Sequence, residues 1–251
     1  MGSKWSKMDP NDLRFCFESI IRVSMDTLAD RINAFNQSLS FWGTLPKGIR
    51  VLNPFQENLD ILKVSSSFYN KFYKDSKQRK LILGINPGRL GAGATGIPFT
   101  DTKRLIEVCQ LEAPAFHTHE PSSVFIYKLI EAFGGPKAFY GRYYINSVCP
   151  LGFVTDKGNG RWVNYNYYDN PVLFKTVRPF IIKSLKAQLN LGLDSETCWV
   201  LGKKNALYLA EINREIKIFK RLIPLDHPRY IMQYKAREAD DYLHRYLELL
   251  H

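Results

Sequence analysis

Short continuous runs of apolar residues alternate along the chain with segments in which apolar residues recur every three or four positions. The continuous runs lie at 80–86, 142–151, 197–202 and 218–228. Such a run, closed by Gly, Pro or Asn, is typical of a strand that is buried on both faces of a parallel sheet. Segments with helical spacing lie between and after them, at about 101–112, 121–133, 171–190, 203–214 and 235–250. Strands that alternate with helices predict βαβ units.

The first third of the chain has helical spacing only. Apolar residues from Asp12 to about Leu39 predict one long amphipathic helix, and a second is expected from about Pro54 to Tyr73. We therefore predict an α/β fold, a three-layer α/β/α sandwich with a central, mainly parallel four-stranded sheet and extra N-terminal helices. The chain would form a single domain, 1–251, with a helical part at 1–75 and an α/β core at 76–251.

One segment, 153–170, interrupts the alternation. Lys157-Gly158-Asn159-Gly160 has strong turn chemistry between two arms rich in β-formers, which predicts a hairpin outside the main sheet. We interpret it as a surface decoration, with a loop that touches a polyanion as the alternative.

Composition narrows the possible partners. Thirty-five Lys and Arg against 24 Asp and Glu give a formal net charge of +11, which favours a polyanion such as nucleic acid or an anionic membrane. No apolar run reaches the roughly 18 residues of a transmembrane helix. The cysteines form no Cys-x-x-Cys pair, which disfavours a zinc ribbon or a disulfide framework and fits an intracellular protein with reduced thiols; they are Cys16, Cys109, Cys149 and Cys198.

The loop after the first predicted strand contains Gly91-x-Gly93-x-x-Gly96, the glycine spacing of a dinucleotide-binding turn. In that fingerprint the first glycine follows the strand directly and the last one opens the helix. Here residues 86–90 separate the strand from the glycines, and Pro98 precedes the next plausible helix cap at Thr100 or Asp101. A nucleotide-dependent Rossmann enzyme is therefore disfavoured.

The same loop carries a more specific pattern. Gly84-Ile85-Asn86-Pro87-Gly88 is followed by Gly91 and then by Thr95-Gly96-Ile97-Pro98-Phe99. In order, these residues resemble the first active-site motif of the single-strand-selective monofunctional uracil-DNA glycosylases, a family of the uracil-DNA glycosylase superfamily. "INSVCPL" at 145–151 and His227-Pro228 resemble two further segments of that family, in the expected order.

The resemblance implies a DNA base-excision repair enzyme. Such an enzyme flips uracil, or a related deaminated or 5-modified base, out of DNA and hydrolyses its N-glycosidic bond, which leaves an abasic site. No lysine occupies a motif position, so we expect hydrolysis without a Schiff-base lyase step. The alternative is a non-catalytic protein that binds single-stranded or damaged DNA on a glycosylase-like scaffold.

By their match to the family motifs, two residues are candidate catalytic groups and four are candidates to bind the base. Asn86 would orient the attacking water, and His227 would donate a hydrogen bond to the base carbonyl as negative charge builds there. Asn146 would read the base edge through its amide, and Phe99 would stack on the flipped ring. Ile85 would also contact the base, and Gly88 would leave room beside its 5-position.

DNA contacts are expected from the same edge of the sheet. The family continues after its histidine with Pro-Ser-Pro-Arg, whereas this chain reads Pro228-Arg229-Tyr230-Ile231-Met232. The Ser-Pro is missing, which indicates a divergent branch and leaves four candidates for the wedge that fills the vacated stack: Arg229, Tyr230, Ile231 and Met232. Backbone phosphates would be bound by Arg89, Lys203 and Lys204.

The sequence predicts neither a cofactor nor a metal. His117 and His119 have the spacing of a ligand pair, but no third ligand accompanies them. We expect a monomer whose partner is uracil-containing DNA, single-stranded, double-stranded or both, with no membrane association. The expected compartment is the bacterial cytoplasm or nucleoid, or the nucleus of a eukaryote.

Overall fold

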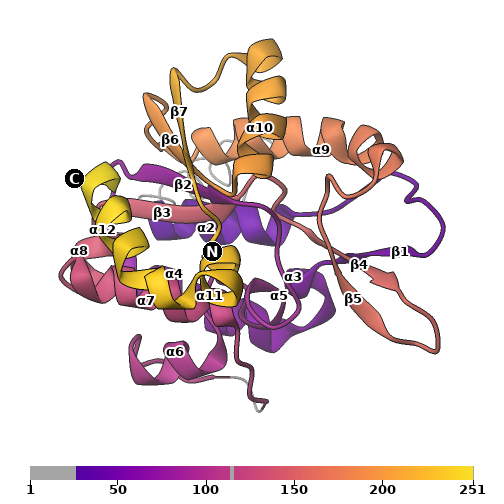
Figure 1. The fold of residues 1–251 in the computed structure, drawn as a ribbon. Helices are drawn as coiled ribbons and strands as arrows, with labels where there is room; N and C mark the ends of the chain where they lie inside the picture. The colour runs from indigo at the N-terminus through magenta and orange to yellow at the C-terminus, as the bar shows by residue number, and fades with distance from the viewer. Residues whose placement is uncertain (1–26, 114–115, 251) are drawn as a thin grey trace, which may run out of the picture.

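The computed structural model describes residues 27–113 and 116–250. Its central sheet has four strands in the order β3-β2-β6-β7, all parallel (Figure 1). Each strand lies within one of the four apolar runs: β2 Lys80–Gly84, β3 Tyr143–Ser147, β6 Thr197–Leu201 and β7 Arg221–Leu225. Every residue of the inner strand β6 is buried, and so is every residue of the edge strand β3, as expected for a sheet covered on both faces.

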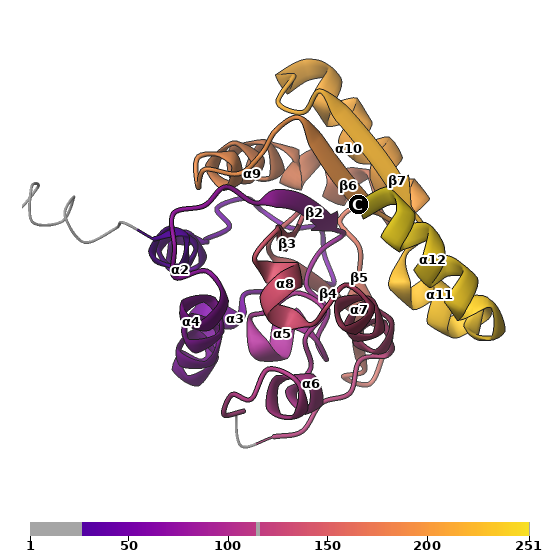
Figure 2. The same cartoon turned by 90° about the vertical axis from the view of Figure 1, so that its left-hand side faces the viewer.

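Helices cover both faces of this sheet. Figure 2 shows α9 and α10 on one side, and α4, α7 and α8 on the other. The bounds of these helices are α4 Leu59–Phe72, α7 Pro121–Ala132, α8 Pro136–Tyr140, α9 Pro171–Leu189 and α10 Lys203–Ile216. The predicted three-layer α/β/α sandwich with a parallel four-stranded sheet is confirmed.

The remaining helices are mostly short. They are α2 Leu28–Ser38, α3 Pro54–Glu57, α5 Ala92–Thr95, α6 Thr102–Glu107, α11 Pro228–Tyr234, the 3-10 turn η1 Ala236–Glu238, and α12 Ala239–Leu250. The Asp101 side chain caps α6, one of the two caps that the sequence offers. Gly91 is the N-cap of α5, which has only four residues, so the glycine loop does not open a long helix as a dinucleotide-binding turn does.

The N-terminal part differs from its prediction in two ways. A capping box at Thr27 and Asp30 begins α2, so the helix expected from Asp12 starts at Leu28 in the described residues, and its earlier part lies outside them. The part predicted as helical, 1–75, also contains a strand, β1 Ile49–Leu52. This strand was missed because it is short and its partner lies about a hundred residues further along the chain.

The predicted hairpin is present, but it is more than a decoration. Strands β4 Gly152–Asp156 and β5 Trp162–Tyr165 pair antiparallel, and β1 joins them in a second sheet of order β1-β4-β5. Figure 1 shows this small sheet on the side toward which β2 points. The strand ends of the main sheet therefore face a second wall.

A buried amide joins this wall to the main sheet. Asn205, in the first turn of α10, donates from Nδ2 to the backbone oxygens of Gly84 at 3.0 Å and Leu201 at 3.2 Å. Its Oδ1 accepts from the hydroxyl of Tyr167, just after the hairpin, at 2.8 Å. One fully buried side chain thus connects the ends of β2 and β6 to the segment that follows β5.

Replacing Asn205 by Ala takes the acceptor from the buried Tyr167 hydroxyl and a donor from the Leu201 oxygen, whereas the Gly84 oxygen keeps the Val148 backbone N–H at 2.9 Å. Each such group costs about 1–3 kcal/mol, so we expect the free energy of unfolding to fall by roughly 2–4 kcal/mol. Tyr167→Phe removes a single hydrogen bond and should cost about 1 kcal/mol. Urea denaturation followed by circular dichroism measures both losses. A loss for Asn205→Ala no larger than that for Tyr167→Phe would contradict the connecting role.

Candidate active site

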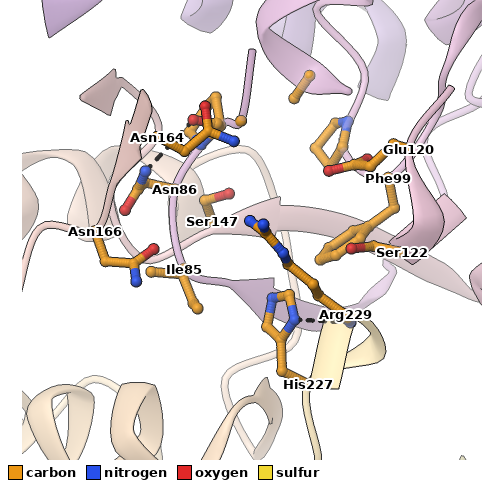
Figure 3. Close-up of a pocket in the computed structure, with 14 residues that line it drawn as sticks. Ile85, Asn86, Phe99, Glu120, Ser122, Ser147, Asn164, Asn166, His227 and Arg229 are labelled. Atoms are coloured by element: carbon orange, nitrogen blue, oxygen red, sulfur yellow. Dashed lines mark hydrogen bonds between the residues drawn. The ribbon is translucent and has the colours of Figure 1, made fainter. Parts of the chain in front are cut away.

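A pocket lies at the carboxyl ends of β2 and β3, where parallel sheets generally place their reactive groups. Figure 3 shows its wall with Asn86 on one side, Phe99 on the other, and His227 below the space between them. Six residues predicted from the sequence line it: Ile85, Asn86, Gly88, Phe99, His227 and Arg229. These residues come from the loop after β2 and from the start of α11, which are about 140 positions apart in the chain.

The Asn86 side chain is held by the segment that follows β5. Its Oδ1 accepts from the backbone N–H of Tyr167 at 3.1 Å, and its Nδ2 donates to the backbone oxygen of Tyr165 at 3.3 Å. These two bonds fix which end of the amide is oxygen. An amide oxygen accepts two hydrogen bonds, so Oδ1 keeps one lone pair for a proton of a water molecule.

His227 is the N-cap of α11, and its Nδ1 accepts from the backbone N–H of Arg229 at 3.1 Å. Burial, together with the charge of the Arg229 guanidinium, lowers the pKa of His227 to about 4. The imidazole is therefore neutral at neutral pH. Because Nδ1 accepts, the proton resides on Nε2, which is the ring donor left for a ligand.

Phe99 has a left-handed backbone, with φ of 54°, a conformation that is uncommon for a bulky residue and that clusters at functional sites. Its ring lies 5.8 Å from the His227 ring, centroid to centroid. A Cβ on Gly84 would lie 3.0 Å from the Phe99 ring, so the absence of a side chain at the end of β2 provides room for the aromatic ring.

Asn146 does not line this pocket. Its Nδ2 donates to the Tyr144 hydroxyl at 2.7 Å, and its Oδ1 accepts from the backbone N–H of Ser147. Asn146 lines a small adjoining cavity, which shares Pro87, Ala92 and Pro98 with the pocket. Successive residues of a strand point to opposite faces, and Ser147, one position further along β3, lines the pocket itself. The role of Asn146 in reading the base stays a prediction.

Gly88 lines the pocket, but the side chains of Asn164 and Glu120 already stand beside it. A Cβ built on Gly88 would lie 3.1 Å from Asn164 Nδ2 and 3.6 Å from Glu120 Oε1. Asn164 Oδ1 also accepts from the backbone N–H of Arg89 at 3.0 Å. The missing side chain thus lets the hairpin approach the loop after β2.

The four wedge candidates lie in helix α11 rather than in a loop. Ile231 is fully buried and packs in the core, so it is not available to enter DNA and that candidate is wrong. Met232 is half-buried, whereas Tyr230 is exposed beside Tyr234. Arg229 is exposed and lines the pocket itself, with its guanidinium extending toward the middle of the view in Figure 3.

The predicted phosphate contacts lie around the pocket. Lys203, at the start of α10, pairs with Asp226, the residue before His227, at 3.0 Å. Lys204 Nζ lies 4.8 Å from the centre of the Tyr168 ring. Arg89 is exposed at the loop after β2. The Lys203 ammonium group is therefore already paired with a carboxylate just after the end of β7.

Five polar residues of the pocket wall were not predicted from the sequence: Glu120, Ser122, Ser147, Asn164 and Asn166. Asn164 and Asn166 alternate along the end of the hairpin, and this period of two was a signal that both face the same way. Glu120 precedes Pro121 at the start of α7 and belongs to no recognisable motif. The hairpin is thus part of the pocket wall, which corrects its interpretation as a surface decoration.

Comparison with known proteins identifies the family. A model of the uracil-DNA glycosylase superfamily matches residues 71–251. The chain belongs to the uracil-DNA glycosylase superfamily. It is also similar to wild-type SMUG2 of Pedobacter heparinus in its crystal structure, with 50% sequence identity, a TM-score of 0.87, and coverage of 89% of this chain and 96% of that chain.

Membership and this similarity confirm the resemblance to the single-strand-selective branch. The protein is a monofunctional uracil-DNA glycosylase, a hydrolase of base-excision repair whose substrate is DNA. In the ranges that the structure describes, no helix is long and apolar enough to cross a membrane. The same ranges contain no group of three His, Cys, Asp or Glu placed to hold a metal ion, and His119 instead contacts Arg104 at 3.1 Å.

The neutral state of His227 can be measured by NMR. We expect its imidazole nitrogens to report a neutral ring, protonated on Nε2, from pH 8 down to about pH 5, with protonation near pH 4. In urea the same ring should titrate near its ordinary pKa of about 6.5. The unfolded state then takes up a proton that the folded state does not, so stability falls as the pH drops from about 6.5 toward 4. A folded-state pKa above 6 would contradict the assignment.

Proposed function

We propose that the protein excises uracil and related oxo-bases from DNA by hydrolysis in the pocket between Asn86 and His227. One observation carries the proposal: a fixed amide and a neutral imidazole line the same pocket as a strained Phe99. Cleavage of the N-glycosidic bond develops positive charge on the sugar and negative charge on the departing base. The pocket offers a fixed amide for the attacking water and hydrogen-bond donors for the departing base.

Asn86 would position the attacking water. Its amide has no useful basicity, so its contribution is orientation rather than proton abstraction. The hydrogen bonds from Tyr167 and to Tyr165 restrict the side chain to one orientation, which is what positioning requires.

The departing base would be stabilised by His227 and Arg229. A neutral Nε2–H donates to the base oxygen as charge builds and does not compete with the base for a proton. The Arg229 guanidinium adds positive charge at the same wall without a carboxylate partner within ion-pair distance in the described residues.

Among the wedge candidates, we favour Arg229. It is exposed, stands at the first turn of α11, and reaches the pocket that a flipped base would enter. On binding DNA its guanidinium would fill the gap in the stack at the opening of the pocket, where its positive charge still faces the departing base. Tyr230 remains the second candidate because its ring is exposed next to Tyr234. Arg89, Lys203 and Lys204 would hold the phosphates around this opening.

Asn86→Ala should reduce base release without loss of folding. Loss of one positioned group at a site of this kind typically costs about 10²–10³ in kcat, and His227→Ala should cost a similar factor. Uracil-containing oligonucleotides are incubated with each variant, treated with alkali and resolved on denaturing gels. Asn190→Ala, at an exposed helix end without a side-chain hydrogen bond, is the matched control.

Strand breaks should appear only after alkali, because the reaction ends at an abasic site. Breaks formed without alkali would contradict the monofunctional reaction. The same preparation tested on uracil, 5-hydroxymethyluracil, hypoxanthine and xanthine, each in single and double strands, establishes the range of bases and the strand preference. Release of none of these bases from any substrate would overturn the proposed function.

Base reading should depend on Ser147 rather than on Asn146. Ser147→Ala removes a hydroxyl that lines the pocket, and we expect kcat/KM for uracil to fall by roughly tenfold, the value of one hydrogen bond. Asn146→Leu removes two internal hydrogen bonds and should lower stability more than it changes the preference among bases. Equal base preferences in wild type and Ser147→Ala, with a changed preference in Asn146→Leu, would restore Asn146 as the reader.

A further inference from the structure

Glu120 is a pocket residue to which neither the proposed reaction nor the family motifs give a role. It occupies the N-cap position of α7, yet its side chain makes no capping hydrogen bond. Its Oε2 is buried and has no hydrogen-bond partner in the part of the chain that the structure describes. Figure 3 shows the carboxyl group beside Phe99, on the wall opposite Asn86. Oε2 lies against Gly91, whereas Oε1 lies on the side of Gly88, which lines the pocket with Glu120. A buried carboxyl group with an unpaired oxygen at a pocket wall calls for an explanation.

The backbone of Glu120 is held firmly from both sides. Its N–H donates to Asp101 Oδ2 at 2.8 Å, and its oxygen accepts from the Ser123 backbone N–H at 3.0 Å and hydroxyl at 2.7 Å. The carboxyl group rests on Gly91, where a Cβ would lie 2.1 Å from Oε2. One glycine of the loop is therefore explained by the space that this carboxyl group occupies.

The surroundings of Glu120 favour its uncharged form. Burial and the nearby charge of Asp101 raise the pKa of Glu120 to about 7, although the positive charge of Arg229 acts in the opposite direction. Asp101 Oδ2 lies 3.2 Å from Arg104 Nη1, 2.6 Å from the Ser123 hydroxyl oxygen and 3.6 Å from His119 Nδ1. His227, on the same pocket, is neutral. An ionised Glu120 would also repel the negative charge that develops on a departing base.

A neutral carboxyl group with its proton on Oε1 presents one hydrogen-bond donor to the pocket. Uracil, hypoxanthine and xanthine share a lactam edge, in which a carbonyl oxygen that can accept such a bond stands next to a ring N–H. We propose that Glu120, in its uncharged form, donates from Oε1 to the lactam carbonyl oxygen of the flipped base as the base departs. This role rests on the proposed function, because it requires that a base enters the pocket.

Two substitutions separate the hydrogen-bonding role of Glu120 from the space that its side chain fills. Glu120→Gln keeps a donor and an acceptor but cannot ionise, whereas Glu120→Met keeps the length and removes both. Single-turnover release of uracil, hypoxanthine and xanthine is measured from pH 5.5 to 8.5. In the wild type, release should fall above about pH 7, approaching tenfold per pH unit, as Glu120 ionises. Glu120→Gln should remove this fall, and Glu120→Met should lose at least about tenfold for all three bases.

The outcomes distinguish a failure of the role of Glu120 from a failure of the proposed function. If the wild type releases bases and Glu120→Met releases them equally well, the role of Glu120 is overturned and the proposed function stands. A wild-type profile that rises through pH 7 overturns the uncharged form. If neither the wild type nor any variant releases a base, the proposed function fails, and the role of Glu120 fails with it.

Stability gives a readout that needs no substrate. A carboxyl group whose pKa is raised on folding destabilises the protein as the pH rises from its unfolded value of about 4.5 to about 7. Glu120→Gln should therefore raise Tm relative to the wild type more at pH 8 than at pH 4.5. The same difference at both pH values would contradict an uncharged Glu120 in the folded protein.

Discussion

The hydrogen bonds of Asn205 are the constraint on which the arrangement of the site depends. A parallel sheet leaves the ends of its strands separate, and a hairpin outside the sheet has no ladder that ties it to them. Asn205 bonds to the ends of β2 and β6 and to the Tyr167 hydroxyl. The backbone N–H of the same Tyr167 then holds Asn86. The Asn86 amide is thus held, through Tyr167, by a buried side chain in the first turn of α10.

The second feature that organises the site is that burial disfavours the charged forms of His227 and Glu120, beside the space where a base would leave. Burial keeps His227 uncharged and favours the uncharged form of Glu120, although the two groups titrate in opposite directions. Arg229 is the cationic side chain that lines the same pocket. A leaving group that departs as an anion therefore meets hydrogen-bond donors and one positive charge, which explains how such a reaction proceeds without a pair of carboxylates.

The glycine-rich loop acquires a steric explanation at each position. Gly84 leaves room for the Phe99 ring, Gly88 for Asn164, and Gly91 for the Glu120 carboxyl group. A Cβ on Gly93 would lie 2.7 Å from the Gly88 oxygen, and Gly96 has a positive φ of 71° at the end of α5. These glycines serve close packing of the pocket wall, and their resemblance to a phosphate-binding turn is one of spacing only.

The sequence by itself determined the four strands, their parallel arrangement and the loop that carries Asn86, because these depend on local periodicity and on a contiguous motif. His227 could be placed at the same edge because parallel strands end together. Only the tertiary structure decided that Ser147 lines the pocket itself while Asn146 lines the adjoining cavity, since side chains alternate along a strand and the motif does not show to which face each one points. It also decided that Ile231 is buried, that the hairpin lines the pocket, and that Oε2 of Glu120 has no hydrogen-bond partner among the described residues. These outcomes depend on contacts between segments far apart in the chain, and no local pattern of residues encodes them.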